Sequence, residues 1–235
     1  MSQRSDELSV EASNSIESAL LSRRSIRAFL KRPVPREDVE YILQLASFAP
    51  SGSNFQPWRV HVLGGKTLEH VTSELSAAFF ELERKPNPEY PYYMDPIIEP
   101  YLSRRRACGW GMYGALGIQR YETTRQTEQR ARNYRFFDAP IGLVFTIDRR
   151  MAIGAFVDYG MFLQSITLAA RSLGLHTCTQ ASIAEYPDVL RRELGLSTDE
   201  MPLCGMSVGY ADPAASVNQF RPNRESVAAF ARFYD

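Results

Sequence analysis

The sequence lacks the features by which several large classes of protein are identified. Its 235 residues include only three cysteines, too few and too widely spaced for a disulfide framework or a CxxC pair. The 27 basic and 27 acidic residues cancel, so no global charge would attract nucleic acid or an anionic membrane. No apolar run approaches membrane-spanning length, and the first residues lack the apolar core of a signal peptide. We therefore expect a cytoplasmic protein that binds neither nucleic acid nor membrane.

Most catalytic motifs are missing as well. The three histidines are isolated, with no HExxH motif or cluster of histidine and cysteine ligands, so no metal site is expected. A GxSxG elbow, a Walker loop and a GxGxxG motif after a strand are also lacking, which argues against hydrolase, P-loop and Rossmann functions. What remains is a site of hydrogen-bond donors rather than of acids and bases. Such a site is typical of a protein whose bound cofactor carries the chemistry.

Hydrophobic periodicity predicts one domain with more helix than strand. Residues 1–13 are polar and expected to be flexible, and residues 14–235, in a chain that is 44% apolar, are expected to form the domain. Helices are predicted over residues 14–22, 36–48, 66–84, 101–134, 152–173 and 225–233, and strands over 58–63, 141–147, 175–178 and 203–210. Few strands among many helices indicate an α+β fold.

Two segments depart from the ordinary amphipathic pattern. The helix predicted over 152–173 is apolar on nearly all sides, which predicts burial in a core or in a subunit interface. The stretch "KPNPEYPYYMDPIIEP", residues 85–100, carries five prolines that break regular structure. Its tyrosines and isoleucines nevertheless suggest that this stretch covers another part of the protein.

The first motif of interest is "RRSIRAF", residues 23–29. In an extended conformation Arg23, Ser25 and Arg27 share one face while Ile26 points to the other. Guanidinium forks suit phosphate, so this face is a candidate phosphate site. A solvated basic helix end is the alternative interpretation.

The second motif is the loop "APSGSNFQPWRV", residues 49–60, between a predicted helix and a predicted strand. Ser51, Ser53, Asn54 and Gln56 offer hydroxyls and amides suited to the polar edge and ribityl hydroxyls of a nucleotide-like ligand. Turn chemistry and capping are the alternative explanation for so many short polar side chains.

The two motifs in this order resemble the FMN-dependent nitroreductase family, in which an R-R/H-S-x-R/K segment and a P-S-x-x-N-x-Q-P-W loop bind the flavin. The likeness continues through residues 136–149, 158–175, 177–182, 206–212 and 221–227, and so covers nearly the whole chain from about residue 16. It implies a nitroreductase-like α+β fold, with a mixed, largely antiparallel sheet flanked by helices in an intertwined homodimer.

The resemblance also implies the residues that bind FMN. The phosphate and ring edge would meet Arg23, Arg24, Ser25 and Arg27, together with Arg224 and Arg221. The loop residues Pro50, Ser51, Gly52, Ser53, Asn54 and Gln56 would reach the flavin of the partner subunit. The backbone of the turn Thr179, Gln180, Ala181 and Ser182 would lie near the flavin N5. Arg132 or Arg135, with Asn133 as a competitor, would approach the ring where negative charge gathers on reduction, unless all three lie on a solvent-facing helix.

The implied activity is that of an FMN-dependent NAD(P)H nitroreductase. NADH or NADPH would deliver hydride to flavin N5 and leave, and a small nitroaromatic acceptor would then take its place, with no titrating catalytic side chain required. Residues 85–130 would form a variable substrate-capping segment, with a pocket of Tyr92, Tyr93, Trp110, Met112 and Tyr113, although these residues suit a dimer core equally well. Quinone or enone reduction, reductive dehalogenation and flavin binding without turnover are the alternative functions. The sequence names neither the preferred donor, NADH or NADPH, nor the physiological acceptor.

Overall fold

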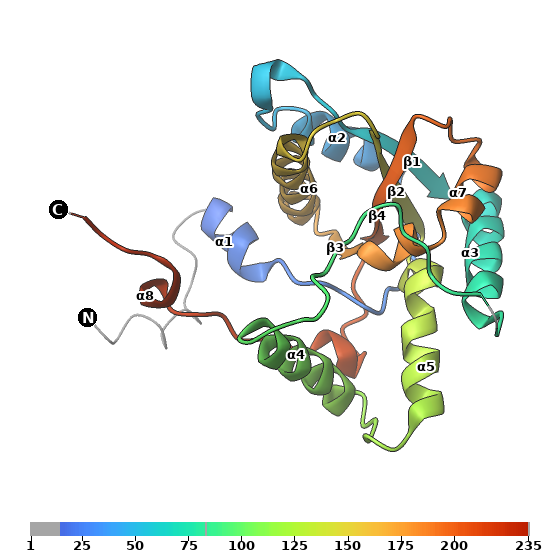
Figure 1. Ribbon diagram of the computed structural model, residues 1–235, viewed down its shortest axis with the longest axis vertical. Helices are drawn as coiled ribbons and strands as arrows, with labels where there is room; N and C mark the ends of the chain where they lie inside the picture. Colours follow the sequence, from blue (N-terminus) through green and yellow to red (C-terminus); the bar gives the residue numbers. More distant parts are fainter. Residues whose placement is uncertain (1–14, 83, 235) are drawn as a thin grey trace.

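The computed structural model of the protein describes residues 15–82 and 84–234, so the N-terminus predicted to be flexible, residues 1–13, lies outside the described residues. Its helices are α1 (Ser15–Ser22), α2 (Arg36–Ala46), α3 (Gly65–Phe80), α4 (Tyr101–Ala115), α5 (Thr123–Ala131), α6 (Gly154–Ser172), α7 (Pro187–Leu194) and α8 (Val227–Phe230). The strands are β1 (Arg59–Gly64), β2 (Ile141–Asp148), β3 (His176–Gln180) and β4 (Glu200–Gly209). Short 3-10 helices are η1 (Gly52–Asn54), η2 (Arg132–Asp138), η3 (Ala181–Glu185) and η4 (Ser216–Asn218). Figure 1 shows the helices arranged around one central sheet.

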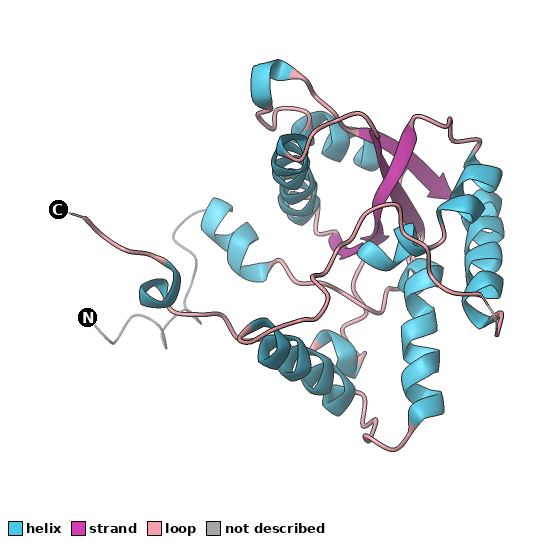
Figure 2. Ribbon diagram, in the orientation of Figure 1, coloured by secondary structure: helices cyan, strands magenta, loops and turns pink. Residues whose placement is uncertain are grey.

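The sheet has the strand order β1-β2-β4-β3, and every neighbouring pair is antiparallel. Its two central strands, β2 and β4, are buried along almost their whole length. This burial explains why both strands read as continuous apolar runs rather than as an alternating pattern. The predicted α+β class with an antiparallel sheet is therefore confirmed, and Figure 2 shows how much of the chain is helix and loop.

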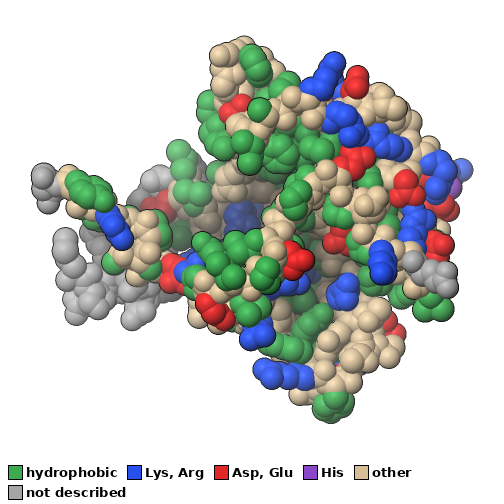
Figure 3. All heavy atoms as spheres, in the orientation of Figure 1, with side chains coloured by type: hydrophobic (Ala, Val, Ile, Leu, Met, Phe, Trp, Pro, Cys, Tyr) green, Lys and Arg blue, Asp and Glu red, His purple; other side chains and the backbone are tan. Residues whose placement is uncertain are grey.

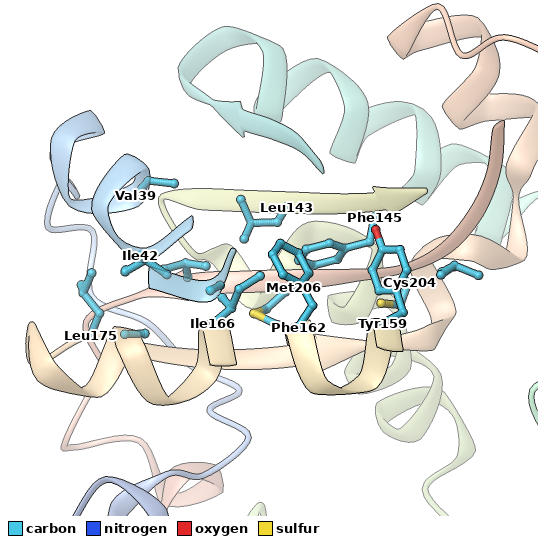
Figure 4. Packing of buried hydrophobic residues seen from close by; sticks show 14 of the residues in the cluster. Val39, Ile42, Leu143, Phe145, Tyr159, Phe162, Ile166, Leu175, Cys204 and Met206 are labelled. Carbon is cyan, nitrogen blue, oxygen red and sulfur yellow. The ribbon is translucent and has the colours of Figure 1, made fainter. Parts of the chain in front are cut away.

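Helices cover both faces of the sheet and form two hydrophobic clusters. On one face α2 and α6 pack against β2, as Figure 4 shows for Val39, Ile42, Phe162, Ile166, Leu143 and Phe145. On the other face α3 and α7 contribute Val71, Leu75, Val189 and Leu190, which pack around Val144. Trp58, at the end of the polar loop, stacks on Phe162 with ring centroids 4.6 Å apart and nearly parallel planes. The loop is thus fastened to the core at the point where β1 begins.

Three predicted helices differ from the structure by more than two residues at an end or are divided. The helical region predicted over 101–134 breaks after α4, where Gly117 adopts a φ of 63° that favours glycine and ends the helix. The helix predicted over 66–84 ends at Phe80, before the proline-rich stretch. The helix predicted over 225–233 is reduced to four residues, since the apolar side chains of Val227 and Phe230 are 56% and 72% exposed and gain little from packing on the described part of the chain.

The α6 helix, expected to be buried nearly all round, buries only one face within a single chain. Tyr159, Phe162 and Ile166 are almost inaccessible, whereas Val157 is 68% exposed. The exposed apolar side of α6 is consistent with the subunit-interface alternative rather than with a core helix. Among the described residues, no helix combines the length and apolar character needed to cross a membrane.

Candidate functional site

The arginine motif runs beside β3 in an extended conformation. Ser25 forms a parallel bridge with Thr177, and the N–H of Ile26 donates to the Thr177 carbonyl at 3.0 Å. Ile26 is 3% exposed, while Arg23 and Arg27 are partly accessible. The motif is therefore extended from Ser25 onward, whereas Arg23 directly follows α1 and donates its N–H to the Ala19 carbonyl at 3.0 Å. The role of the motif as a phosphate site stays a prediction.

Asn218 in η4 holds this motif against the C-terminal part of the chain. Its Oδ1 accepts from the N–H of Arg27 at 2.9 Å, and its Nδ2 donates to the carbonyls of Ala28 and Asp212 at 2.8 and 2.9 Å. The guanidinium of Arg24 donates to the Asn218 carbonyl at 3.2 Å. Asn218 is 5% exposed. The sequence reasoning missed this residue, because one asparagine in a loop has neither a periodic nor a motif signal.

A cavity of about 390 Å³, here called the arginine cavity, opens where the motif meets the C-terminal segment. Its polar lining consists of Ser25 and five arginines: Arg23, Arg24, Arg27, Arg221 and Arg224. The other lining residues include Cys108 of α4, which the sequence reasoning also missed, and none of the residues that line the cavity is acidic. Figure 3 shows basic side chains set back in a hollow of the surface between α4 and the main body of the molecule.

The electrostatics of the arginine cavity fit an anion. Burial lowers the pKa of Arg23, and the nearby positive charge of Arg224 lowers it further. Burial likewise lowers the pKa of Arg24, with Arg221 as the second cause. Two pairs of like charges therefore face one another without a carboxylate in the lining, and a phosphate ester would relieve their repulsion and accept several charge-assisted hydrogen bonds. The phosphate of FMN matches this donor set.

The polar loop that precedes β1 lies apart from the arginine cavity within one chain. None of its residues lines that cavity, and Figure 1 shows the loop beyond α6, on the far side from α1 and α4. Gly52 donates its N–H to Asp158 of α6 at 3.1 Å, and the Ser51 hydroxyl accepts from the N–H of Gln56 at 3.0 Å. Ser53, Asn54 and Gln56 have φ of 48°, 57° and 47°, left-handed values that cost free energy in residues other than glycine. The loop is therefore held in a strained shape and is open to solvent from Gly52 to Gln56.

The side chain of Gln180, just before the turn after β3, forms hydrogen bonds to both η2 and β4. Gln180, 4% exposed, donates from Nε2 to the Asn133 carbonyl at 2.7 Å and accepts from the Ser207 hydroxyl at 2.6 Å. The Asn133 side chain donates to the Arg130 carbonyl at the end of α5, at 3.0 Å, and its approach to the flavin ring stays a prediction. The Ser182 hydroxyl is buried with no partner among the described residues. With its side chain engaged internally, Gln180 presents only backbone to a ligand.

Arg132 and Arg135 share one carboxylate. Their guanidinium groups lie 3.1 and 3.4 Å from Asp138, which follows two other residues in the left-handed region, Phe136 and Phe137. Both arginines line a cavity other than the arginine cavity. Their approach to the flavin ring stays a prediction.

Four of the five predicted substrate-pocket residues form two aromatic pairs. Tyr92 and Tyr93, 59% and 61% exposed, have ring centroids 4.8 Å apart, and Trp110 and Tyr113 pair on α4 at 5.7 Å. Met112 is half-buried on the same helix. None of the five lines the arginine cavity, so their role also stays a prediction.

The start of the proline-rich segment is firmly anchored. Glu89 accepts from Arg191 at 2.6 Å and from Arg149 at 2.9 Å. The hydroxyl of Tyr90 donates to the Leu203 carbonyl of β4 at 2.5 Å. These bonds fix the stem of the segment that leads to the exposed tyrosines.

Comparison with known proteins gives a consistent result. The Nitroreductase family model matches residues 20–210. The chain is 41% identical to the nitrobenzene nitroreductase of Ectopseudomonas oleovorans and 42% identical to the chloronitrobenzene nitroreductase of Comamonas testosteroni, each over 93% of this chain and 96% of the relative. Among solved structures, the FMN and NADPH-dependent nitroreductase NfnB from sphigopyxis sp. strain HMH superposes with a TM-score of 0.92 at 35% identity, covering 94% of this chain and 100% of that one. The FMN-dependent NfnB from Mycobacterium smegmatis, solved in complex with NADPH, gives a TM-score of 0.89 at 32% identity, with coverage of 94% and 98%.

Proposed function

The chain belongs to the nitroreductase family, and we propose that it is an FMN-dependent oxidoreductase that uses NADH or NADPH to reduce small nitroaromatic compounds. The observation that carries this proposal is the arginine cavity, whose five guanidinium groups have no acidic neighbour in the lining. When bound, FMN supplies the two-electron transfer from NAD(P)H to the nitro group. The protein supplies binding, orientation and electrostatics.

Each part of the site has a task in this proposal. Arg23, Arg27 and Arg224 bind the FMN phosphate, and Asn218 holds the backbone of the arginine motif in register with them. The turn Thr179–Ser182 presents its backbone to the ring, and its position is fixed by the Gln180 hydrogen bonds. Arg132 and Arg135 supply positive charge toward the ring edge. Residues 85–130, with Tyr92, Tyr93, Trp110, Met112 and Tyr113, cap the site and restrict the entry of water.

The complete site requires two copies of the chain. The strained loop Pro50–Gln56 is exposed and far from the arginine cavity of its own chain, so in a homodimer it reaches the FMN of the partner subunit. The exposed apolar side of α6, which includes Val157, supports burial in such an interface. The three free cysteines suit a reducing compartment, and we place the enzyme in the cytoplasm.

The experiment that tests the function is steady-state oxidation of NADPH, and of NADH, by the FMN-loaded protein with nitrobenzene as acceptor. Consumption of the donor should depend on nitrobenzene under anaerobic conditions, and chromatography should detect the nitroso and hydroxylamine products. Donor oxidation with quinones but not with any nitroarene would contradict the proposed substrate class. A size-exclusion mass equal to that of a single chain in the active preparation would contradict the dimer.

A further inference from the structure

The 3-10 helix η3, which begins within the turn proposed to lie against FMN, is held at both ends by consecutive residues of η2. Immediately before η3, Gln180 donates from Nε2 to the Asn133 carbonyl at 2.7 Å. At the end of η3, Glu185 accepts through Oε2 from the hydroxyl of Tyr134 at 2.6 Å. Asn133 and Tyr134 are neighbours in the chain, so one short piece of η2 fixes both ends of η3.

The hydrogen bond between Tyr134 and Glu185 is of a strong kind. Tyr134 is 2% exposed, and burial, followed by its bond to Glu185, raises the pKa of the hydroxyl, which therefore stays protonated and donates. Bonds from a hydroxyl to a carboxylate are about 2.5 to 2.7 Å long and about twice as strong as bonds between neutral groups. The Tyr134 ring is flanked by Phe79 and Tyr186, with centroids 4.8 and 5.5 Å away. Packing thus directs the hydroxyl toward the end of η3.

The η2 helix is suited to hold another element because its own backbone is fixed. Phe136 and Phe137 are 0% and 1% exposed and adopt left-handed φ of 49° and 52°. Such a conformation in residues other than glycine persists only where the surrounding structure imposes it. Phe136 also packs in the same hydrophobic cluster as Val144 of β2. Tyr134 therefore extends from an element that is anchored to the central sheet.

The middle of η3 is attached to β4. Ile183 is 0% exposed, and a Cβ added at Gly205 would come within 2.6 Å of its Cγ1, so the glycine leaves the room that this side chain fills. A rigid segment with two attachments can still rotate about the line that joins them, and a third attachment removes this freedom. The bond of Gln180 and the packing of Ile183 are two attachments, and Glu185 is the third.

Glu185 is also fixed through its backbone. Its carbonyl accepts from the N–H of Asn87 at 2.8 Å. Asn87 lies two residues before Glu89, whose carboxylate is bound by two arginines. Glu185 therefore meets η2 through its side chain and the anchored start of the proline-rich segment through its backbone.

We propose that Glu185 and Tyr134 are positioning residues for the reaction, because their hydrogen bond holds the N–H groups at the start of η3 in one direction. This inference rests on the proposed function, in which the backbone of the turn Thr179–Ser182 lies against the FMN ring. Donors that are already fixed assist a reaction because they need no reorganisation as charge develops. Without the bond, η3 rotates about its two remaining attachments, and reduction of the bound flavin slows although FMN stays bound.

The first measurement is independent of activity. Hydrogen exchange of the backbone amides of residues 181–185 is followed by mass spectrometry in the oxidised, FMN-loaded protein, with no NAD(P)H present. Tyr134→Phe and Glu185→Ala should exchange about tenfold faster than wild type, the change expected for loss of one hydrogen bond to a charged group. Glu185→Gln should exchange at the wild-type rate, because its amide oxygen still accepts from the Tyr134 hydroxyl.

The second measurement is the rate at which NADPH, or NADH, reduces the bound flavin in an anaerobic stopped-flow experiment. Tyr134→Phe and Glu185→Ala should be slower by about tenfold, less than the hundredfold or more expected when such a donor is deleted outright. FMN content and the KM for nitrobenzene should stay within about twofold of wild type, whereas kcat falls wherever flavin reduction limits it. Glu185→Gln should retain the wild-type rate, but not when it is combined with Tyr134→Phe, since the rescue needs the hydroxyl.

The matched control is Thr146→Val, which also removes a buried hydroxyl that donates to a carboxylate. The Thr146 hydroxyl donates to Glu200 at 2.8 Å on the central sheet, and neither residue lines the arginine cavity or belongs to η2 or η3. This variant should lose a similar amount of stability and leave both exchange in residues 181–185 and flavin reduction unchanged. If Tyr134→Phe does not fold, Glu185→Ala and Glu185→Gln provide the same comparison.

Three results would overturn the inference while the proposed function stands. The first is wild-type exchange and flavin reduction in Tyr134→Phe and in Glu185→Ala. The second is an equal change in Thr146→Val, which would show that general loss of stability is the cause. The third is loss of FMN from Tyr134→Phe, with a wild-type rate once FMN is restored, which would assign the bond to cofactor retention. A wild-type protein whose flavin neither NADPH nor NADH reduces would instead contradict the proposed function itself.

Discussion

Replacement of Asn218 by alanine tests how the arginine motif is held in place. The side chain makes three hydrogen bonds, to the N–H of Arg27 and to the carbonyls of Ala28 and Asp212. The bond to Ala28 is fully buried and is expected to contribute about 1 to 1.5 kcal/mol, and the two part-buried bonds about 0.5 to 1 kcal/mol each. The free energy of unfolding should therefore fall by about 2 to 3.5 kcal/mol, which lowers Tm by about 4 to 14 °C for a chain of this size.

The same substitution should also reduce the amount by which added FMN raises Tm. FMN binds only the folded protein, so a saturating excess raises Tm by an amount that depends on affinity. Without Asn218 the arginine motif is no longer bonded to η4, and the increase in Tm on addition of FMN should shrink. The assay is thermal unfolding followed by circular dichroism, with and without added FMN.

Gln219 provides the control from the neighbouring position. It is exposed, with one side-chain bond to the Pro213 carbonyl at 3.1 Å, so Gln219→Ala should change stability by less than about 0.5 kcal/mol and leave the response to FMN intact. An Asn218→Ala variant that unfolds at the wild-type temperature would contradict the stabilising role of this side chain. A destabilised variant whose Tm rises with FMN as much as that of the wild type would contradict its role in FMN binding.

Three further predictions concern charged groups. Arg23→Ala combined with Arg27→Ala should weaken FMN binding by about a hundredfold or more in equilibrium dialysis, since two charge-assisted hydrogen bonds contribute at least about 3 kcal/mol. Unchanged FMN content would contradict the phosphate role. Glu89→Ala should lower the free energy of unfolding by about 1 to 2 kcal/mol in a denaturant titration, since Arg149 and Arg191, both partly buried, lose their carboxylate. Glu40→Ala, at an exposed ion pair, should have no measurable effect. Equal effects would contradict the importance of burial for this ion pair. Burial, followed by the charge of Arg171, lowers the pKa of His176 to about 4. The unfolded chain therefore binds more protons below about pH 6.5, and stability should fall from there toward pH 4. A Tm profile over pH 4–7 that is no flatter in His176→Gln than in wild type would exclude this cause.

Much of the fold could be predicted from local pattern. The strands β2 and β4 read as apolar runs because both of their faces are covered, and α2 shows its buried Val39 and Ile42 at helical spacing. The ends of elements were less predictable. The break after α4 depends on a left-handed Gly117, which a helix-compatible sequence on both sides conceals.

The grouping of Arg23, Ser25 and Arg27 was predictable, because alternation in an extended chain places these polar residues on one face, and all three line the arginine cavity. Asn218 was not predictable, because its importance depends on contacts across the fold with residues more than 180 positions away. The position of the polar loop is a second case, since its partner in the proposal is another copy of the chain.

The central claim, that the arginine cavity holds FMN in a nitroarene-reducing enzyme, is tested most directly by an anaerobic spectroscopic titration of the purified protein. The account predicts flavin absorption bands that bleach on addition of NADPH or NADH and return when nitrobenzene is added. Bands that bleach but do not recover with any nitroarene would contradict the assigned substrate class. A spectrum without flavin, unchanged after FMN is supplied, would contradict the account as a whole.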